Sequence, residues 1–251
     1  MSRSSRLVRS PLLAEAGFSH GFTTRLDGVS TGRYQSLNVG GKWGDDPDAV
    51  RRNRELVASD GGFALASLYT AKQVHGARVL VVDGSATLAE EADALTTTTQ
   101  GHAVGVYTAD CVPILVGDRD GRVAAAHAGW RGTVAEIAVR TVEQLVALGA
   151  KPAQLWAALG PSICVRCFEV GPEVAREFRR WPDAVATTYG EKPHIDLWAV
   201  NRQQLLAAGI SVAHLDTTPP CTHCDPTHYF SYRRDGAQIG QHLSFIVSTA
   251  C

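Results

Sequence analysis

The sequence lacks an excess of charge of either sign. Its 24 lysine and arginine residues balance 25 aspartate and glutamate residues, which leaves a net charge of -1 over 251 residues. Binding to a nucleic-acid backbone or an anionic lipid surface needs a concentration of positive charge. We therefore expect neither nucleic acid nor a membrane among the partners.

Long apolar runs are absent too. No stretch approaches the ~20 apolar residues of a membrane-spanning helix, which predicts no transmembrane segment. The N-terminal residues are basic and serine-rich without the apolar stretch of a secretory signal, so we expect residues 1–16 to be a flexible N-terminus. A cytoplasmic location is then the default, and the six cysteines are expected as thiols or metal ligands rather than disulfides.

Repeats of fixed period and Gly/Ser- or Pro-rich linkers are missing as well, which favours a single catalytic domain over residues 17–251. Strand-like and helix-like segments are interleaved without strict alternation. This pattern predicts an α+β layered domain, with mixed β-sheets packed centrally and helices on the outside. Pro113 near the start of one run favours a bulge or an edge strand. Strands are predicted at residues 68–76, 78–83, 104–107, 112–116, 123–127, 155–159, 210–215 and 243–247.

Capping residues indicate where helices begin. Asp46 precedes a helix that runs to about Ser59, and Asp196 precedes another. Thr133 and Glu136 form a T-x-x-E capping box before apolar residues spaced by three and four, which predicts a helix from Thr133.

Three residues stand at the ends of apolar strands: His75 in K-Q-V-H-G, Cys111 in T-A-D-C, and His127 in A-A-H-A-G-W-R-G-T. Two imidazoles and a thiolate can bind zinc and leave its fourth tetrahedral position open for a reactant. The same donors suit copper. The spacing matches no short metal motif, so two alternatives stay open. One is a buried thiol beside two hydrogen-bonded histidines, and the other is a Cys111 nucleophile with a histidine base.

The other cysteines include two C-x-x-C pairs, Cys164/Cys167 and Cys221/Cys224. Their number suits a structural zinc ribbon, but a long helix-bearing segment separates them. Buried or loosely paired thiols are therefore the favoured interpretation, and the terminal Cys251 is expected to be exposed.

Arg131 is the arginine whose sequence position best suits a bound anion. It lies beside His127 and just before the predicted helix start at Thr133, where free backbone N–H groups would also face the anion.

The ordered motifs from Phe18 to Ile246 resemble the YfiH/LACC family of zinc-dependent purine nucleoside phosphorylases, formerly called polyphenol oxidases or laccases. They include S-L-N-V-G, K-Q-V-H-G, T-A-D-C-V-P-I-L, A-A-H-A-G-W-R-G-T, L-G-P-S-I, C-F-E-V-G, C-T-H-C and F-S-Y-R-R-D-G. Cys164 departs from the glycine that is usual in the family. The resemblance implies a fold similar to that of a toxin-deamidase group.

For the site, the resemblance implies that His75, Cys111 and His127 are the catalytic metal ligands, with zinc as cofactor and copper as the alternative. Substrate contacts are expected at Arg25, Asn38, Gln73 and Arg131.

For the reaction, the resemblance implies phosphorolysis: adenosine or inosine and phosphate give a free base and ribose 1-phosphate. Some members are similar to adenosine deaminases and methylthioadenosine phosphorylases. The expected partners are purine nucleosides and phosphate, and the expected state is a monomer or homodimer. The alternatives are a Cys111/His hydrolase or deamidase, for example in editing of peptidoglycan precursors, and a copper-dependent polyphenol oxidase.

Overall fold

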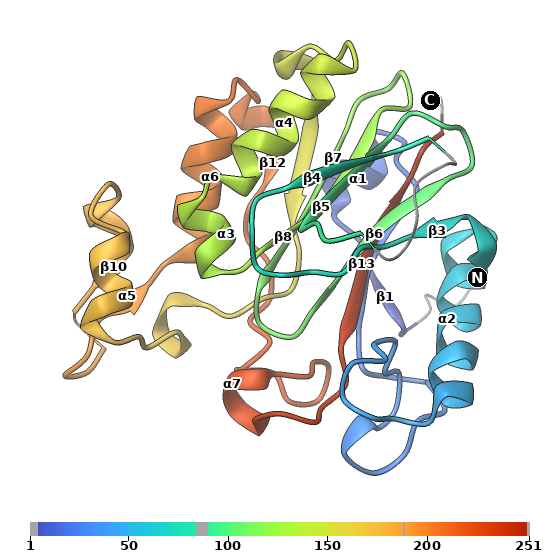
Figure 1. The fold of residues 1–251 in the computed structure, drawn as a ribbon, viewed down its shortest axis with the longest axis horizontal. Coiled ribbons are helices and arrows are strands. Elements are labelled where there is room, and N and C mark those ends of the chain that lie inside the picture. Colours follow the sequence, from blue (N-terminus) through green and yellow to red (C-terminus); the bar gives the residue numbers. More distant parts are fainter. Residues whose placement is uncertain (1–4, 84–89, 188, 250–251) are drawn as a thin grey trace.

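Two β-sheets form the centre of the protein, with helices against their outer faces (Figure 1). The computed structural model describes residues 5–83, 90–187 and 189–249. The five-stranded sheet has the order β1-β2-β13-β6-β3, and the six-stranded sheet has the order β12-β9-β7-β8-β5-β4. The first contains β1 (Leu7–Val8), β2 (His20–Thr23), β13 (His242–Val247), β6 (Ala103–Thr108) and β3 (Leu68–Tyr69). The second contains β12 (Leu215–Asp216), β9 (Trp156–Leu159), β7 (Val112–Gly117), β8 (Val123–Ala128), β5 (Ala94–Thr97) and β4 (Val79–Val82).

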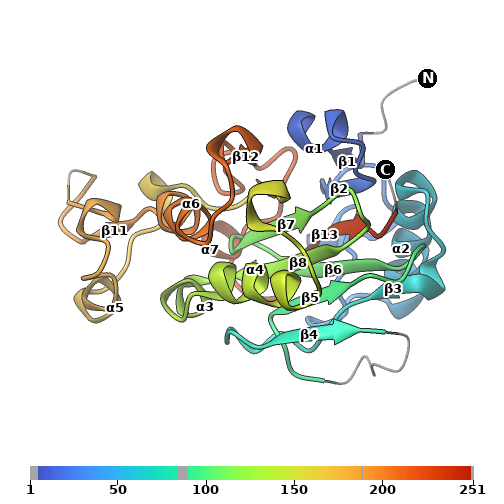
Figure 2. The ribbon, with the colours of Figure 1, turned by 90° about the horizontal axis from the view of Figure 1, so that it is seen from above.

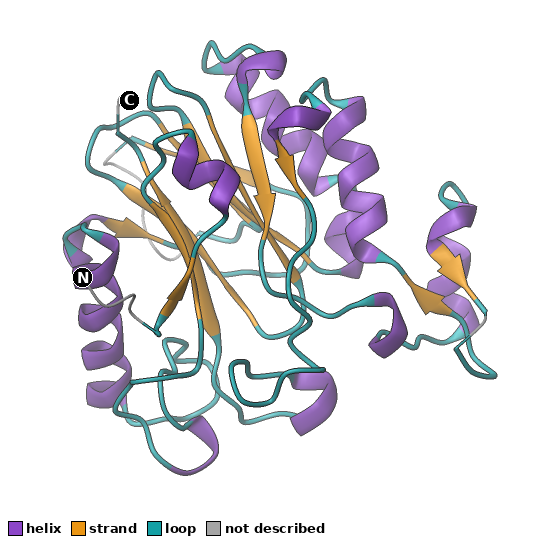
Figure 3. Cartoon of the chain, turned by 180° about the vertical axis from the view of Figure 1, so that it is seen from behind, coloured by secondary structure: helices purple, strands orange, loops and turns teal. Residues whose placement is uncertain are grey.

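One segment of the chain projects from the body of the molecule. In Figure 3 a segment with α5 and the hairpin β10–β11 projects from one side of the body. The helices are α1 (Pro11–Glu15), α2 (Pro47–Gly61), α3 (Trp130–Val134), α4 (Ile137–Ala147), α5 (Pro172–Glu177), α6 (Leu197–Ala207) and α7 (Tyr232–Asp235), and the hairpin strands are β10 (Val185–Ala186) and β11 (His194–Ile195).

The layers are α2, the five-stranded sheet, the six-stranded sheet, and then α4 with α6 (Figure 2). The two sheets share an apolar core to which Val106 and Ile246 contribute from one sheet and Leu115 and Ala125 from the other. Three strand pairs, β3–β6, β4–β5 and β9–β12, are parallel, and the others within these two sheets are antiparallel. The predicted α+β fold with central mixed sheets is therefore confirmed.

Strand β8 lies between these layers and is buried on both faces. Val123 and Ala125 face the other sheet, whereas Ala124 and Ala126 face the core under α4 and α6. The small alanines let both layers approach the strand closely. This packing fixes the strand end that carries His127.

Two predicted helix starts are confirmed by their hydrogen bonds. The Asp46 carboxylate accepts from the Asp48 N–H at 3.0 Å at the start of α2. The Asp196 carboxylate accepts from the Ala199 N–H at 2.9 Å at the start of α6. These are short-range contacts, which explains why the local sequence predicts them.

The helix predicted to start at Thr133 is wrong in its start and its cap. Helix α3 begins at Trp130, and the Thr133 N–H donates to the Gly129 carbonyl at 2.8 Å. Glu136 has a φ of 61° and separates α3 from α4. The Thr133 hydroxyl accepts from Asn201 of α6 at 3.1 Å. Contacts with α6 replace the capping box that the local pattern favours.

Three strand predictions also need correction. The strand expected over residues 68–76 ends at Tyr69, and that over 210–215 is replaced by a 3-10 turn at Val212–His214 before β12. Pro113 does not lie in an edge strand, because β7 pairs with both β8 and β9. The proline is tolerated because pairing with β9 begins only at Ile114.

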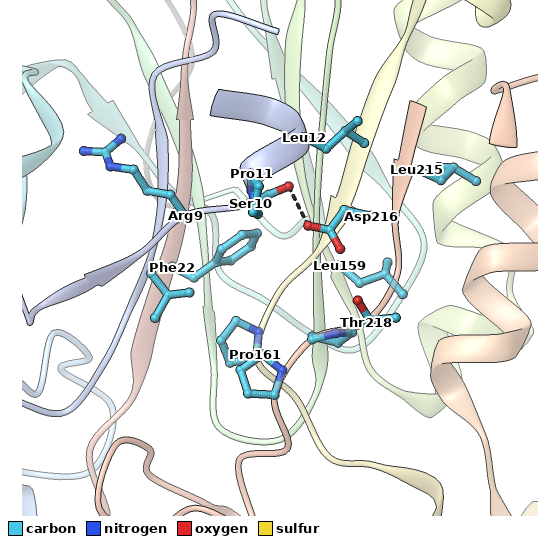
Figure 4. A pocket seen from close by; sticks show the side chains of 13 residues that line it. Arg9, Ser10, Pro11, Leu12, Phe22, Leu159, Pro161, Leu215, Asp216 and Thr218 are labelled. Carbon is cyan, nitrogen blue, oxygen red and sulfur yellow. Dashed lines mark hydrogen bonds between the residues drawn. The ribbon is translucent and has the colours of Figure 1, made fainter. Parts of the chain in front are cut away.

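Within the segment expected to be a flexible N-terminus, the structure has β1 and α1, and Leu13 is fully buried. The Ser10 hydroxyl accepts from the Leu13 N–H at 3.3 Å and donates to Asp216 at 2.6 Å. Figure 4 shows the hydrogen bond from Ser10 to Asp216 at a hollow of about 430 Å³. Cys251 lies outside the described residues. In the described part of the chain, no helix has both the length and the apolarity needed to cross a membrane.

Candidate metal centre

Three separate segments bring His75, Cys111 and His127 together. The antiparallel register of β7 and β8 pairs Val112 with Ala128, so that Cys111 and His127 meet at one end of the two strands. His75 joins them from the loop after β3, with a φ of 61°. The metal-ligating atoms of the three side chains lie within 4.8 Å of one another.

Asp93, which directly precedes β5, holds both histidines in place. Its carboxylate accepts the backbone N–H groups of Val74, His75 and Gly76 at 3.2, 2.9 and 2.6 Å. It also contacts His127 Nδ1 at 2.8 Å, and it is fully buried. A carboxylate at Nδ1 leaves Nε2 of His127 for the metal, which is the arrangement common around histidine ligands.

The charges of the group favour a thiolate. Burial raises the pKa of the Cys111 thiol, but His127 and the hydrogen bonds from both histidines outweigh this and lower it to about 6. Burial lowers the pKa of His127, but the thiolate and Asp93 raise it to about 9. Burial also raises the pKa of Asp93, yet its bonds to His127 and to the backbone bring it below the usual value. The thiolate is the form of cysteine that binds metals.

Gly129 leaves room for the group. A Cβ atom at this position would lie 3.1 Å from the Cys111 sulfur and 3.2 Å from Cδ2 of His75. Two imidazoles and a thiolate without an obstructing side chain fit a zinc ion with one open position, and the same donors fit copper.

The group lies at a cleft of about 900 Å³. Aromatic rings line it, and Trp43 and Tyr232 stack with their centroids 6.0 Å apart and an interplanar angle of 26°. Among the described residues that line the cleft, Asp110 is the only carboxylate, whereas the basic residues are Lys42, Lys72, Arg131 and Arg233. This excess of positive charge contrasts with the net charge of -1 of the whole chain.

Two of the four expected substrate-contact residues line this cleft. The Arg131 guanidinium lies 4.2 Å from the ring centroid of Trp130. The Gln73 side-chain amide donates to the Tyr107 carbonyl at 2.8 Å and accepts from its N–H at 2.7 Å. Gln73 therefore ties the loop of His75 to β6.

The structure does not bring Arg25 and Asn38 to the cleft. Arg25 donates to the carbonyls of Gln35 and Pro226. Asn38 is buried, and its Oδ1 accepts from the N–H of Gln241, a cleft residue, at 2.8 Å. Both side chains hold loops near the cleft.

Sequence reasoning missed Asp93 and the aromatic residues Trp43, Phe168 and Tyr232. Asp93 had one available signal, because it is an acidic residue between two alanines just before a threonine-rich segment that the sequence predicts as strand or turn. The aromatic residues come from three separate segments, with Tyr232 at the start of α7, and no local pattern connects them.

The fold and the site define a class of layered α+β proteins with a His/His/Cys metal-binding group at an aromatic, positively charged cleft. Residues 19–249 match the model of the family described as multi-copper polyphenol oxidoreductase laccase, and the chain belongs to this family.

Its relatives include both enzymes and solved structures. A purine nucleoside phosphorylase of Deinococcus radiodurans is 43% identical over 244 residues, which cover 94% of this chain and 90% of the relative. Adenosine deaminase RL5, from an unknown prokaryotic organism, is 40% identical over 234 residues, which cover 87% and 89%. The structure of the hypothetical protein YfiH of Bacillus licheniformis matches with a TM-score of 0.91 and 31% identity, covering 98% and 97%. The resemblance to the YfiH/LACC family is confirmed.

Proposed function

We propose that this chain is a zinc-dependent purine nucleoside phosphorylase that acts on adenosine or inosine. The observation that carries the proposal is the union, in one cleft, of the His75–Cys111–His127 group, stacking rings and basic side chains. The purine nucleoside phosphorylase at 43% identity over nearly the whole chain supports the assignment.

Residues of the cleft suit the two substrates. A purine is a flat ring that binds well against aromatic faces, which Trp43, Tyr232 and Phe168 provide. Phosphate is an anion, and Arg131 and Lys42 lie on the same surface. Asp110 does not oppose this charge directly, because its carboxylate accepts hydrogen bonds from Thr222, Ser231 and the Arg233 N–H.

In the reaction, an oxygen of hydrogen phosphate forms a bond to C1′ of the ribose while the bond from C1′ to the base nitrogen breaks, and the leaving base takes up the proton that the phosphate loses. Positive charge develops on the sugar, so the nucleophile must be held close in the correct orientation. Arg131 is assigned to orient phosphate. His75, Cys111 and His127 would hold the zinc ion, which supplies Lewis acidity at its open position when bound. Asp93 keeps the proton of His127 on Nδ1.

Deamination of adenosine is the second candidate, and the likeness to adenosine deaminase RL5 favours it. It uses the same base pocket but replaces the amino group of adenine with an oxygen from water, without phosphate. The two reactions therefore differ in product and in phosphate dependence.

Two further alternatives use the same three side chains differently. A hydrolase would use the Cys111 thiolate as nucleophile beside His127. A copper oxidase would follow the description of the family model. Protection of Cys111 from alkylation by zinc but not by substrate would favour the metal site over the hydrolase, and phenol oxidation no faster than with free copper would contradict the oxidase.

Chromatography of the products from adenosine, with and without phosphate, tests the proposal. We expect adenine only when phosphate is present. Cys111→Ser should abolish the reaction, whereas Cys251→Ser, as a cysteine control, should retain it. Inosine formed independently of phosphate would favour the deaminase, and full activity of metal-free protein would contradict the proposed role of zinc.

We further propose that residues 17–251 act as one catalytic domain, in the cytoplasm, as a monomer or homodimer. The lack of fixed-period repeats and of Gly/Ser- or Pro-rich linkers in the sequence, and the matched range of residues 19–249, support the single domain. Size-exclusion chromatography with light scattering measures the oligomeric state.

A further inference from the structure

Four cysteines outside the catalytic group converge at one point. Cys164 and Cys167 lie in the loop after β9, and Cys221 and Cys224 lie in the loop after β12. The two pairs are 57 residues apart along the chain. Even so, all four sulfur atoms lie within 4.8 Å of one another. The fold therefore brings together the two cysteine pairs, although their separation in the sequence favoured independent pairs.

The backbone holds the two loops in register. Ser162 and Cys221 form a parallel β-bridge, with the Ser162 N–H donating to the Pro220 carbonyl at 3.2 Å and the Thr222 N–H donating to the Ser162 carbonyl at 3.1 Å. β9 and β12, which precede the loops, are also parallel neighbours. The pairs are therefore positioned by the sheet.

Each pair lies in a turn that directs its sulfur atoms to the same point. The Cys167 N–H donates to the Cys164 carbonyl at 3.0 Å, and the Asp225 N–H donates to the Cys221 carbonyl at 3.3 Å. The Cys164 N–H donates to the Cys221 sulfur at 3.3 Å, a contact that stabilises charge on sulfur. Arg166, between the first two cysteines, also contacts Cys164 and brings positive charge to the cluster.

The distances distinguish a metal site from the other uses of cysteine. The Cys167 and Cys224 sulfurs are 3.4 Å apart, well beyond the ~2.0 Å of a disulfide bond. Tetrahedral zinc with bonds of about 2.3 Å separates its sulfur ligands by about 3.8 Å. Structural thiols usually pack singly in an apolar core. Here Cys224 is exposed and two others are half-buried, so burial does not explain why they converge.

We propose that Cys164, Cys167, Cys221 and Cys224 bind a structural zinc ion, separate from the His75–Cys111–His127 centre. Four thiolates fill the tetrahedral shell and leave no position for a substrate, so the ion has a structural role.

The location indicates what the ion stabilises. The Ile163 N–H, beside Cys164, donates to the Asp110 carbonyl at 2.9 Å. The Thr222 hydroxyl, beside Cys221, donates to the Asp110 carboxylate at 2.6 Å. Asp110 directly precedes Cys111 and has a φ of 95°. The proposed ion thus joins the two loops that hold the backbone next to a catalytic ligand.

Metal analysis of the full chain tests the proposal. Wild-type protein loaded with zinc and passed through a desalting column should retain about two zinc ions per chain. Cys111→Ser should retain about one, bound by the four cysteines, and Cys167→Ser/Cys224→Ser should also retain about one, bound by the catalytic group. Cys251→Ser serves as the matched cysteine control and should behave as wild type.

Cobalt identifies the ligands independently of activity. In the Cys111→Ser background, Co²⁺ should give the intense thiolate-to-metal absorption of a tetrahedral four-sulfur site, and adding the Cys167→Ser/Cys224→Ser change should remove it. In wild-type protein, a mercurial reagent should release that zinc ion as about four thiols react, a measurement that needs no variant.

Three results would overturn the proposal. They are an unchanged zinc content in folded Cys167→Ser/Cys224→Ser, alkylation of the four thiols by iodoacetamide in zinc-loaded wild-type protein as fast as in zinc-free protein, and a disulfide within the cluster by mass spectrometry. None of these measurements depends on nucleoside turnover, so the structural zinc site and the proposed phosphorylase activity succeed or fail separately.

Discussion

Replacing Asp93 with asparagine should weaken metal binding while leaving the three ligands in the chain. Oδ1 of Asp93 accepts from the His75 N–H and contacts His127 Nδ1, and Oδ2 accepts from the N–H groups of Val74 and Gly76. Asparagine can accept on one side only. Either orientation of its amide therefore places an NH₂ group against two donors.

The expected loss of metal affinity follows from these contacts. If the amide turns its NH₂ group to His127, Nδ1 must accept, and the ring proton moves to Nε2, the nitrogen needed for the metal. If it turns the other way, the backbone of the His75 loop loses two bonds. Loss of such a partner lowers metal affinity by about 10- to 100-fold, or about 1.4 to 2.7 kcal/mol.

Competition with a chelator of known zinc affinity at pH 7 measures the effect, together with thermal unfolding. Asp118→Asn is the matched control, because Asp118 is a buried carboxylate that accepts backbone N–H groups of Asp120 and Arg122 and follows β7 at the end opposite to Cys111. It should lower stability without changing zinc affinity at the centre. A folded Asp93→Asn variant with wild-type affinity would refute the reasoning.

Three other changes give further tests. Gly129→Ala should reduce zinc content at the centre about 10-fold or more, because its Cβ would crowd the Cys111 sulfur at 3.1 Å, and normal zinc content would contradict this. Arg131→Ala should raise the KM for phosphate about 10-fold with a smaller effect on the KM for the nucleoside, since a lost contact to an anion is worth about 1.5 kcal/mol; equal changes in both constants would argue against the role. His20 is buried, which lowers its pKa to about 4, so the unfolded chain binds an additional proton as pH falls below about 6.5. Neutral His20 therefore contributes up to about 3 kcal/mol to the free energy of unfolding above that pH, and this contribution is lost toward pH 4. Urea unfolding of His20→Gln at pH 7 and pH 5 should show a weaker pH dependence than that of the wild type.

The parts of the fold that the sequence predicts well depend on short-range contacts. Asp46 and Asp196 cap their helices through N–H groups two and three residues away. The runs that form β7 and β8 are apolar apart from His127, because both faces of these strands are buried. In each case, the physical cause lies within the same few residues as the pattern.

The errors arise where distant segments decide the structure. Asn201 and Gln204 of α6 bond to the side chain and the carbonyl of Thr133, so the capping box expected there does not form. The strand predicted over residues 68–76 ends at Tyr69, and the N–H groups of Val74, His75 and Gly76 donate to the carboxylate of the distant Asp93. The spacing of residues within a short segment does not predict contacts with residues far away in the sequence.

In the candidate site, too, local features could be predicted and long-range contacts could not. His75, Cys111 and His127 could be selected because each ends a strand or lies beside a turn, and the family resemblance joined them. The convergence of Cys164 and Cys221 depends instead on the parallel pairing of β9 with β12, which no short motif encodes.

The central claim is tested most directly by phosphorus NMR of zinc-loaded protein with adenosine and inorganic phosphate. The proposed phosphorylase predicts that a ribose 1-phosphate signal appears as free phosphate is consumed, and that Cys111→Ser gives none. Consumption of adenosine with no loss of inorganic phosphate would contradict it.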